Sequence, residues 1–118
     1  MDVERITFCD AIFGQLIASL RKERGLEQEA LAERVGISRA ALSRIERGDS
    51  STNLATLIHL SKALGFQRAS ELIDKYESAE SEIMERGIQI VPKEKARGDG
   101  AVLALVGIAA LAALLAGK

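Results

Sequence analysis

The sequence contains few of the residue types from which catalytic sites, metal centres and disulfide frameworks are built. Its 118 residues include one cysteine and one histidine. A single thiol, Cys9, cannot form an intrachain disulfide or a metal cluster, and it fits a protein of the reducing cytoplasm. We expect it to be a small, partly buried hydrophobic residue. His59 has no second histidine, cysteine or carboxylate at ligand spacing. Since no nucleophile–base–acid set or phosphate loop is visible either, we expect no enzyme activity, no metal ion and no cofactor.

Proline and β-strand patterns are also scarce. The only proline is Pro92, the N-terminal residues do not begin a secretory signal, and the one strand-like piece is residues 88–91. Apolar residues instead recur at helical spacing, and a glycine follows each such segment where a helix would end. The segments are 12–24, 28–35, 38–47, 53–64 and 72–83. The pattern predicts an all-α fold.

An excess of charge of one sign is missing too, since the formal net charge is −1. The charges are nevertheless segregated along the chain. Between residues 34 and 47, four arginines accompany a single acid, Glu46, whereas between residues 67 and 86, six acids accompany three basic residues. Because local charge steers a partner, the near-neutral total does not argue against binding to nucleic acid.

Residues 28–48 predict two short helices joined by a tight turn. Gly36 can adopt the positive φ that the turn needs, and Ser38 is a candidate N-cap for the second helix. Ile37, Leu42 and Ile45 give that helix an apolar face. Its opposite face carries a set of polar and small side chains: Arg39, Ala40, Ser43, Arg44 and Arg47. An α-helix fits the major groove of DNA, where arginine can donate two hydrogen bonds to guanine and a small apolar residue can contact a thymine methyl group.

Four stretches of the sequence resemble the phage-repressor-like (Cro-type) helix-turn-helix family. They are LRKERGL at 20–26, QEALA at 28–32, SRIERG at 43–48 and LIHLSKALG at 57–65. The resemblance covers about half of the chain, roughly residues 12–74. It implies a five-helix, repressor-type helix-turn-helix domain that binds double-stranded DNA.

The resemblance also implies roles for individual residues. Bases are expected to be read by Arg39, Ala40 and Arg44, and we add Ser43 because it shares their helix face. Phosphates are expected to be contacted by Gln28, Ser38 and Arg47, with Gln28 also bracing the recognition helix. Arg21 and Glu46 match a pair that forms an internal salt bridge in relatives.

Outside this domain we expect an N-terminal extension (1–11), a helical extension (75–91), a polar linker (92–100) and a hydrophobic tail helix (101–118). Leu72, Tyr76, Ala79 and Ile83 form a heptad-like stripe, which could serve dimerisation or plain core packing. Residues 101–117 carry no charged side chain. As a helix they would extend about 26 Å, slightly less than the ~30 Å hydrocarbon core of a bilayer. The tail could anchor the protein to the inner face of the cytoplasmic membrane or pack against copies of itself.

Our leading hypothesis is a sequence-specific, cytoplasmic transcriptional regulator that acts as a dimeric repressor and reads the major groove with residues 38–47. The second hypothesis is a non-enzymatic protein that tethers or organises DNA, with the tail driving membrane attachment or oligomerisation. A third is an antitoxin-type partner that binds both DNA and a toxin.

Overall fold

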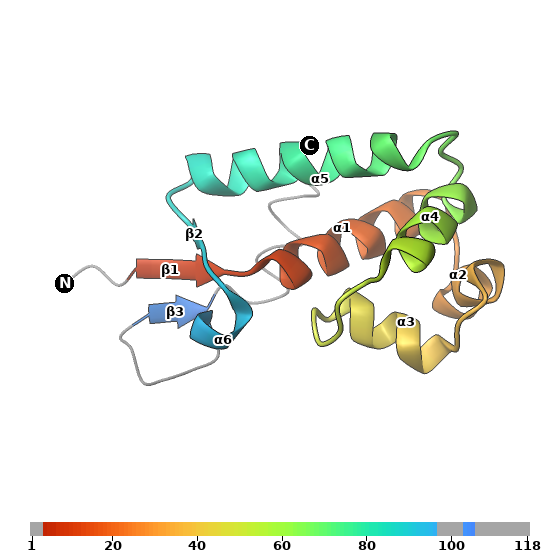
Figure 1. The fold of residues 1–118 in the computed structure, drawn as a ribbon, viewed down its shortest axis with the longest axis horizontal. Helices are drawn as coiled ribbons and strands as arrows, with labels where there is room; N and C mark the ends of the chain where they lie inside the picture. Colours follow the sequence, from red (N-terminus) through yellow and green to blue (C-terminus); the bar gives the residue numbers. More distant parts are fainter. Residues whose placement is uncertain (1–3, 97–102, 106–118) are drawn as a thin grey trace.

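The computed structural model describes residues 4–96 and 103–105, and within them five longer helices form the body of the molecule (Figure 1). These are α1 (Cys9–Glu23), α2 (Gln28–Val35), α3 (Arg39–Glu46), α4 (Leu54–Ala63) and α5 (Ala69–Glu85). A one-turn helix, α6 (Lys93–Ala96), and three short strands, β1 (Glu4–Thr7), β2 (Gln89–Ile90) and β3 (Leu103–Leu105), complete the described part. The expected helical, five-helix fold class is therefore confirmed.

Local side-chain chemistry sets several of the helix boundaries. The Ser38 hydroxyl accepts a hydrogen bond from the Ala41 backbone N–H at 3.0 Å, and the Asn53 side chain accepts one from Thr56 at 2.8 Å. Each therefore satisfies a donor that the first turn of its helix leaves without an intrahelical partner. At the start of α5 the carboxylate of Glu71 accepts a hydrogen bond from the backbone N–H of the N-cap residue, Arg68, at 2.9 Å.

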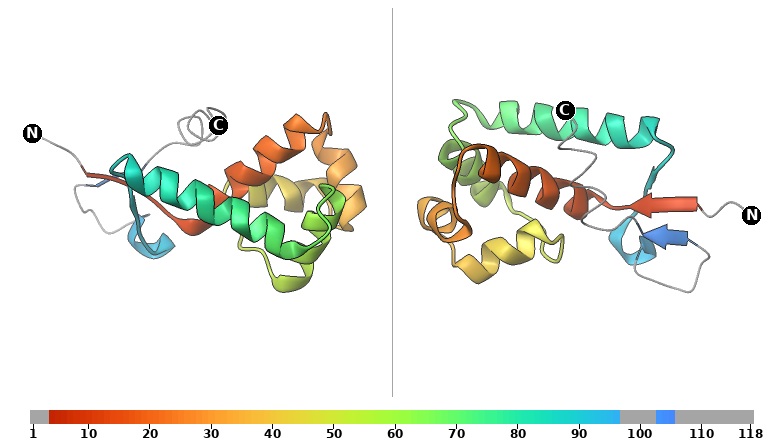
Figure 2. Two further views of the ribbon diagram at one scale, coloured as in Figure 1. Left: turned by 90° about the horizontal axis from the view of Figure 1, so that it is seen from above. Right: turned by 180° about the vertical axis from the view of Figure 1, so that it is seen from behind.

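Helix α1 runs through the middle of the molecule and is covered from both sides. Helix α5 lies antiparallel to it on one side, while α2 and α3 lie on the other, as two opposite views agree (Figures 1 and 2). The most deeply buried side chains come from all five helices. They include Ile12, Ile17, Leu31, Leu42, Leu60, Leu72 and Ile83.

The heptad-like stripe on α5 packs inside the monomer. Leu72, Ala79 and Ile83 are at most 3% exposed and belong to the same hydrophobic core as α1, and Tyr76 packs against that core. Of the two interpretations of this stripe, core packing is the one that the structure shows. Leu72, Ala79 and Ile83 are therefore not accessible to a second copy, whereas Tyr76 is only partly buried.

A small parallel sheet closes one end of the molecule, with strand order β2-β1-β3 (Figure 1). Ile6 pairs with Gln89 on one side and with Leu105 on the other. The prediction that 101–118 form one helix is wrong for residues 103–105, which are β3. The apolar pattern alone could not reveal this, because the strand forms on the free edge of β1, where its backbone groups find hydrogen-bond partners. The rest of the expected tail helix lies outside the described residues, as does the second half of the expected linker.

Within residues 4–96 and 103–105, the helices are all too short or too polar to cross a membrane. The expected membrane-spanning segment falls mainly on residues that the structure does not describe. Cys9, which we expected to be partly buried, is exposed at the first residue of α1.

Candidate DNA interface

Helices α2 and α3 form a helix-turn-helix unit. Gly36 ends α2 in the left-handed conformation with φ of 88°, and its backbone N–H still bonds to Ala32 at 2.9 Å. The next residue, Ile37, donates to the same carbonyl at 3.0 Å. Ala32 is 2% exposed and belongs to the close-packed hydrophobic core, so a larger side chain there would displace its neighbours. The turn therefore fixes the direction in which α3 leaves α2.

The outer face of α3 presents the side chains that the sequence assigned to base contacts. Arg39, Ala40 and Arg44 are exposed, and Ser43 is half-buried. The structure gives neither Arg39 nor Arg44 a side-chain partner among the residues it describes. Leu42 and Ile45 point the opposite way into the core. The helix thus buries one face and leaves two guanidinium groups on the other, available to a ligand.

Arg47 and Ser38 occupy the two ends of α3. Arg47 donates to the Ser43 hydroxyl and to the Asp49 carboxylate, the latter at 3.1 Å. These bonds hold the exposed side chain of Arg47 beside the outer face of α3. Ser38 is engaged in capping, but its exposed position at the N-terminus of α3 puts it where backbone N–H groups favour an anion.

Gln28 brings α2 to the same surface. It is the first residue of α2, and it shares a surface hollow with Arg39 and with the carboxylates of Glu27 and Glu29. Its side-chain amide donates to Glu46 at 2.8 Å. One amide hydrogen is then committed within the protein, and the second remains for an external acceptor.

Glu46 is the centre of a network that joins three helices. Arg21 donates to both of its carboxylate oxygens, from Nε at 2.8 Å and from Nη2 at 3.1 Å. Arg21 also donates from Nη1 to the carbonyl of Leu26 at 2.8 Å. Arg21 is 9% and Glu46 5% exposed, so this bidentate pair lies in the interior and holds the end of α3 against α1.

Two residues of α1 that position α3 were missed by the sequence reasoning. Gln15, 6% exposed, donates its side-chain amide to the carbonyl of Glu46 at 3.1 Å. Gly14 lies against the backbone of Ile45 and Glu46, where a Cβ atom would overlap the carbonyl oxygens. A glycine inside an amphipathic helix is the signal that could have revealed this close approach.

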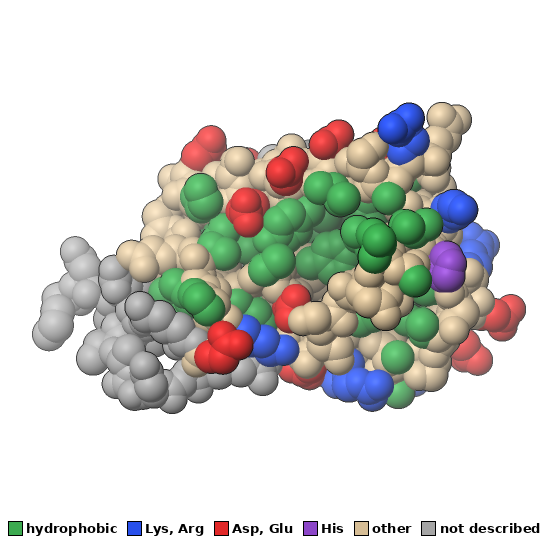
Figure 3. Space-filling view, in the orientation of Figure 1, with side chains coloured by type: hydrophobic (Ala, Val, Ile, Leu, Met, Phe, Trp, Pro, Cys, Tyr) green, Lys and Arg blue, Asp and Glu red, His purple; other side chains and the backbone are tan. Residues whose placement is uncertain are grey.

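Charge is distributed unevenly over the surface. Acidic side chains line the outer edge of α5, away from α3 (Figure 3). A hollow on α5 is bordered by Asp74, Glu77, Glu82 and Glu85. In the described part of the chain, no cluster of histidine, cysteine and carboxylate side chains could hold a metal ion. A polyanion would therefore approach the α2–α3 side more readily than the α5 side.

Comparison with known proteins gives the same assignment. Residues 17–70 match the helix-turn-helix domain family. The chain is 33% identical over 96 residues to the immunity repressor protein of Bacillus phage phi105, with 74% of this chain and 67% of the relative covered. It is also 40% identical over 57 residues to a helix-turn-helix-type transcriptional regulator of Methanothermobacter thermautotrophicus, covering 48% of this chain and 83% of the relative.

Among solved structures, the chain is similar to the restriction-modification controller protein C.AhdI from Aeromonas hydrophila. The identity is 35%, with 53% of this chain and 94% of the other covered and a TM-score of 0.51. The clp gene regulator ClgR from Corynebacterium glutamicum shares the fold at 24% identity and a TM-score of 0.55, over 61% of this chain and 92% of the other. Because α2 and α3 have helix-turn-helix geometry and the relatives share this domain, the chain belongs to the phage-repressor-like helix-turn-helix family of DNA-binding transcriptional regulators.

Proposed function

We propose that the protein is a homodimeric repressor that recognises a short two-fold-symmetric operator by inserting α3 into the major groove. The observation that carries the proposal is the outer face of α3. There Arg39 and Arg44 are exposed on a helix whose position is fixed by buried contacts. Groups held in place lose less conformational freedom on binding than flexible ones do, which favours specific recognition.

Base recognition is assigned to the first two turns of α3. Arg39 and Arg44 can each donate two parallel hydrogen bonds to O6 and N7 of a guanine. Ala40, exposed beside Arg39, is small enough to let the helix approach closely and to contact a thymine methyl group. Ser43 is assigned a base contact as well. Its hydroxyl accepts a hydrogen bond from Arg47, so its own hydrogen is free to reach an acceptor on a base.

Phosphate contacts are assigned to the residues that border this face. Gln28 and Ser38 stand at the starts of α2 and α3, where N–H groups and the helix dipole favour a negative charge. Arg47 stands just beyond the other end of α3. Such contacts set the register and orientation of a protein on DNA but do not read the sequence. Gln28 would link the phosphate to the Arg21–Glu46 pair, so that backbone contact and recognition-helix position are coupled.

A dimer and a repressor role are supported by different considerations. One recognition helix of this length reads only a few base pairs, and helix-turn-helix proteins commonly gain affinity and specificity by presenting two such helices to a symmetric site. The phage phi105 relative is named an immunity repressor. A protein that occupies an operator without supplying further activity would act by excluding other proteins from that DNA.

Footprinting on genomic DNA fragments at increasing salt tests the proposal. We expect one or a few discrete protected sites with two-fold sequence symmetry, which persist at salt concentrations that remove non-specific binding. Analytical ultracentrifugation of the complex should give two protein chains per site. Broad coverage that disappears uniformly with salt would instead support a DNA-organising protein.

A further inference from the structure

The loop that follows the recognition helix is tied to parts of the chain outside the helix-turn-helix unit. This loop, residues 47–53, joins α3 to α4 and carries Arg47 together with the Asp49 carboxylate that accepts from it at 3.1 Å. Gly48 lies directly against α1, where a Cβ atom would lie 2.9 Å from the Cα atom of Ala11. The loop is therefore packed onto the start of α1 at this residue.

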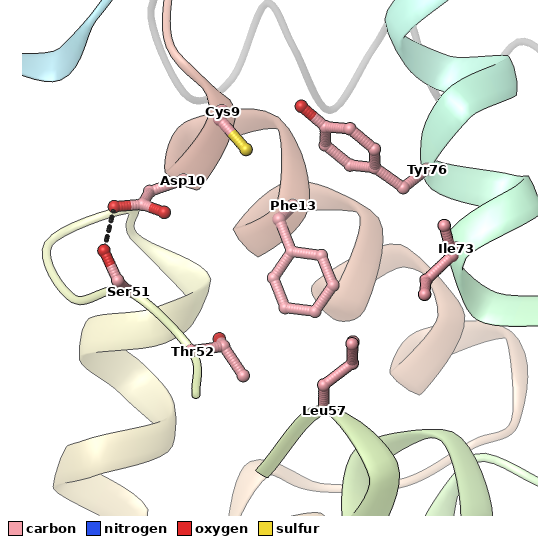
Figure 4. A pocket seen from close by; sticks show the side chains of 8 residues that line it. All are labelled: Cys9, Asp10, Phe13, Ser51, Thr52, Leu57, Ile73 and Tyr76. Carbon is pink, nitrogen blue, oxygen red and sulfur yellow. Dashed lines mark hydrogen bonds between the residues drawn. The ribbon is translucent and has the colours of Figure 1, made fainter. Parts of the chain in front are cut away.

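Asp10, the second residue of α1, holds two side chains through one carboxylate oxygen. Ser51 in the loop donates its hydroxyl to Oδ2 of Asp10 at 2.7 Å (Figure 4), and Nζ of Lys93 lies 3.7 Å from the same oxygen. The Lys93 ammonium also donates to the backbone carbonyl of Asp49 at 3.1 Å. Asp10 and Lys93 thus restrain the loop at two of its residues, Ser51 and Asp49.

The sheet brings Lys93 to this position. Ile90 pairs with Thr7 of β1, and the backbone N–H of the next residue, Val91, donates to the Thr7 carbonyl at 2.9 Å. The chain then begins α6 at Lys93, whose ammonium lies 5.8 Å from the ring centroid of Phe8. Because Phe8 is buried and directly precedes α1, this cation–π contact keeps the ammonium beside the start of α1.

The contacts of Lys93 and Asp10 are only partly open to solvent. Their side chains are 30% and 21% exposed. A single exposed ion pair contributes little to stability, but here one cation serves a carboxylate, a carbonyl and an aromatic ring, and the members of such a network restrain one another. Both residues lie outside residues 17–70, so the restraint on the loop comes from segments that precede and follow the helix-turn-helix domain.

We propose that Lys93 is a positioning residue for DNA binding. Together with Asp10 it fixes the loop after α3, and so holds the Asp49 carboxylate where it orients Arg47 toward the DNA backbone. The β2–α6 segment therefore contributes to DNA binding without contacting DNA. This assignment rests on the proposed phosphate contact of Arg47, whereas the restraint on the loop can be measured in the free protein.

Amide hydrogen exchange in the absence of DNA measures that restraint. We would compare the full chain with Lys93→Met, which keeps the apolar stem but removes the ammonium. The control is Lys75→Met, which removes an exposed lysine of α5. The Asp49 N–H, which donates to the Arg44 carbonyl at 2.9 Å, should exchange about threefold faster in Lys93→Met alone. The Gly36 N–H at the end of α2 should exchange at one rate in all three proteins. Unchanged exchange at Asp49, or equal acceleration at both amides, would overturn the proposal.

Operator binding then separates positioning from a simple effect of charge. Lys93→Met removes a positive charge and Asp10→Ala a negative one, so long-range attraction to DNA alone would change the affinity in opposite directions. A lost restraint should instead weaken binding about threefold in both variants. Opposite effects of the two substitutions would overturn the proposal.

The Arg47→Ala background shows whether Lys93 acts through Arg47. There Lys93→Met should weaken binding no further, because the side chain that it positions is already missing. A further loss of affinity with a shallower salt dependence would identify Lys93 as a phosphate contact in its own right and overturn the proposal. If Arg47→Ala left the salt dependence unchanged, the phosphate contact of Arg47 would fail, while faster exchange at Asp49 would still establish the restraint on the loop.

Discussion

Gly14 in α1 lies directly against the carbonyl oxygen of Ile45, at the end of α3. A Cβ atom at residue 14 would overlap that oxygen and would lie 2.7 Å from the carbonyl oxygen of Glu46. The two helices therefore meet backbone to backbone, and the side-chain amide of Gln15 donates to the same Glu46 carbonyl. The orientation of α3 relative to α1 depends on this contact.

Gly14→Ala should consequently destabilise the domain even though alanine is the better helix former. The methyl group requires α1 and α3 to separate, and overpacking of this kind costs about 1–3 kcal/mol. We expect a lower Tm by thermal denaturation and weaker binding to the operator. Ser19→Ala, a half-buried position on the same helix, is the control and should change neither. If Gly14→Ala raised the Tm, the close approach would not be important for stability.

The contact at Gly14 also indicates what sequence patterns can and cannot predict. The boundaries of α2, α3 and α4 were predictable because their signals are local: Ser38 and Asn53 cap helices within three residues, and Gly36 ends α2. The reason for a glycine at residue 14, by contrast, lies in the backbone of residue 45. The role of Gln15 could not be predicted for the same reason, since the carbonyl that it donates to belongs to the distant Glu46.

The strand-like pattern of residues 88–91 is confirmed by β2, but the rest of the small sheet escaped prediction on similar grounds. Strand β1 pairs with residues more than eighty positions away, and parallel strands leave no turn between them for a pattern to reveal. Residues 103–105 are as apolar as the rest of the tail, so the free edge of β1, rather than composition, decides that they form a strand. Helical spacing alone predicted that the arginines of α3 share one exposed face. The Arg21–Glu46 pair and the bracing role of Gln28 were expected only from the family resemblance.

The Arg21–Glu46 pair should be essential to stability in a way that surface ion pairs are not. Arg21 is only 9% exposed, and Glu46→Ala leaves its guanidinium without the carboxylate that it pairs with. Removing one partner of a buried pair costs about 3–5 kcal/mol. Urea denaturation of Glu46→Ala, Arg21→Ala and the double variant would give the coupling energy. Additive effects of the two single substitutions would contradict this assignment. Arg86→Ala, which removes the exposed Arg86–Glu82 pair, should cost less than about 1 kcal/mol.

Arg39→Ala and Arg44→Ala should each weaken operator binding by about 1–3 kcal/mol while hardly changing the affinity for random DNA. The physical reason is that a bidentate contact to guanine exists only at the cognate base pair. Titrations on operator and on scrambled DNA at the same salt concentration give both values. Equal losses on the two DNAs would identify these arginines as phosphate contacts. Because both side chains are exposed, the Tm of each variant should match that of the parent protein.

Arg47 should contribute equally to the binding of operator and random DNA, unlike Arg39 and Arg44. Arg47→Ala removes one cation from the protein–DNA contact, so binding should weaken on every sequence and the slope of log K against log salt should become shallower by about 0.9. Gln28→Ala should also weaken binding on every sequence. Asp49→Asn provides a matched comparison. It removes the carboxylate that accepts from Arg47 at 3.1 Å and should tighten binding to all DNA. An unchanged salt slope in Arg47→Ala would exclude the phosphate role.

Tyr76 should ionise at a higher pH than an ordinary tyrosine. Burial of its ring beside the core raises the pKa of the phenol, and contacts with Cys9 and with Glu80, to which the hydroxyl donates at 3.0 Å, act in the same direction. The sequence has one tyrosine and no tryptophan, so phenolate absorbance reports on this residue alone. We expect the native protein to titrate above the ordinary value of about 10, and the urea-unfolded protein to titrate near it. Because the folded pKa is the higher one, the neutral phenol contributes stability that is complete below pH ~10 and is lost as the pH rises further. Tyr76→Phe should remove this part of the alkaline destabilisation, whereas a native titration near pH 10 would show that the phenol is solvated.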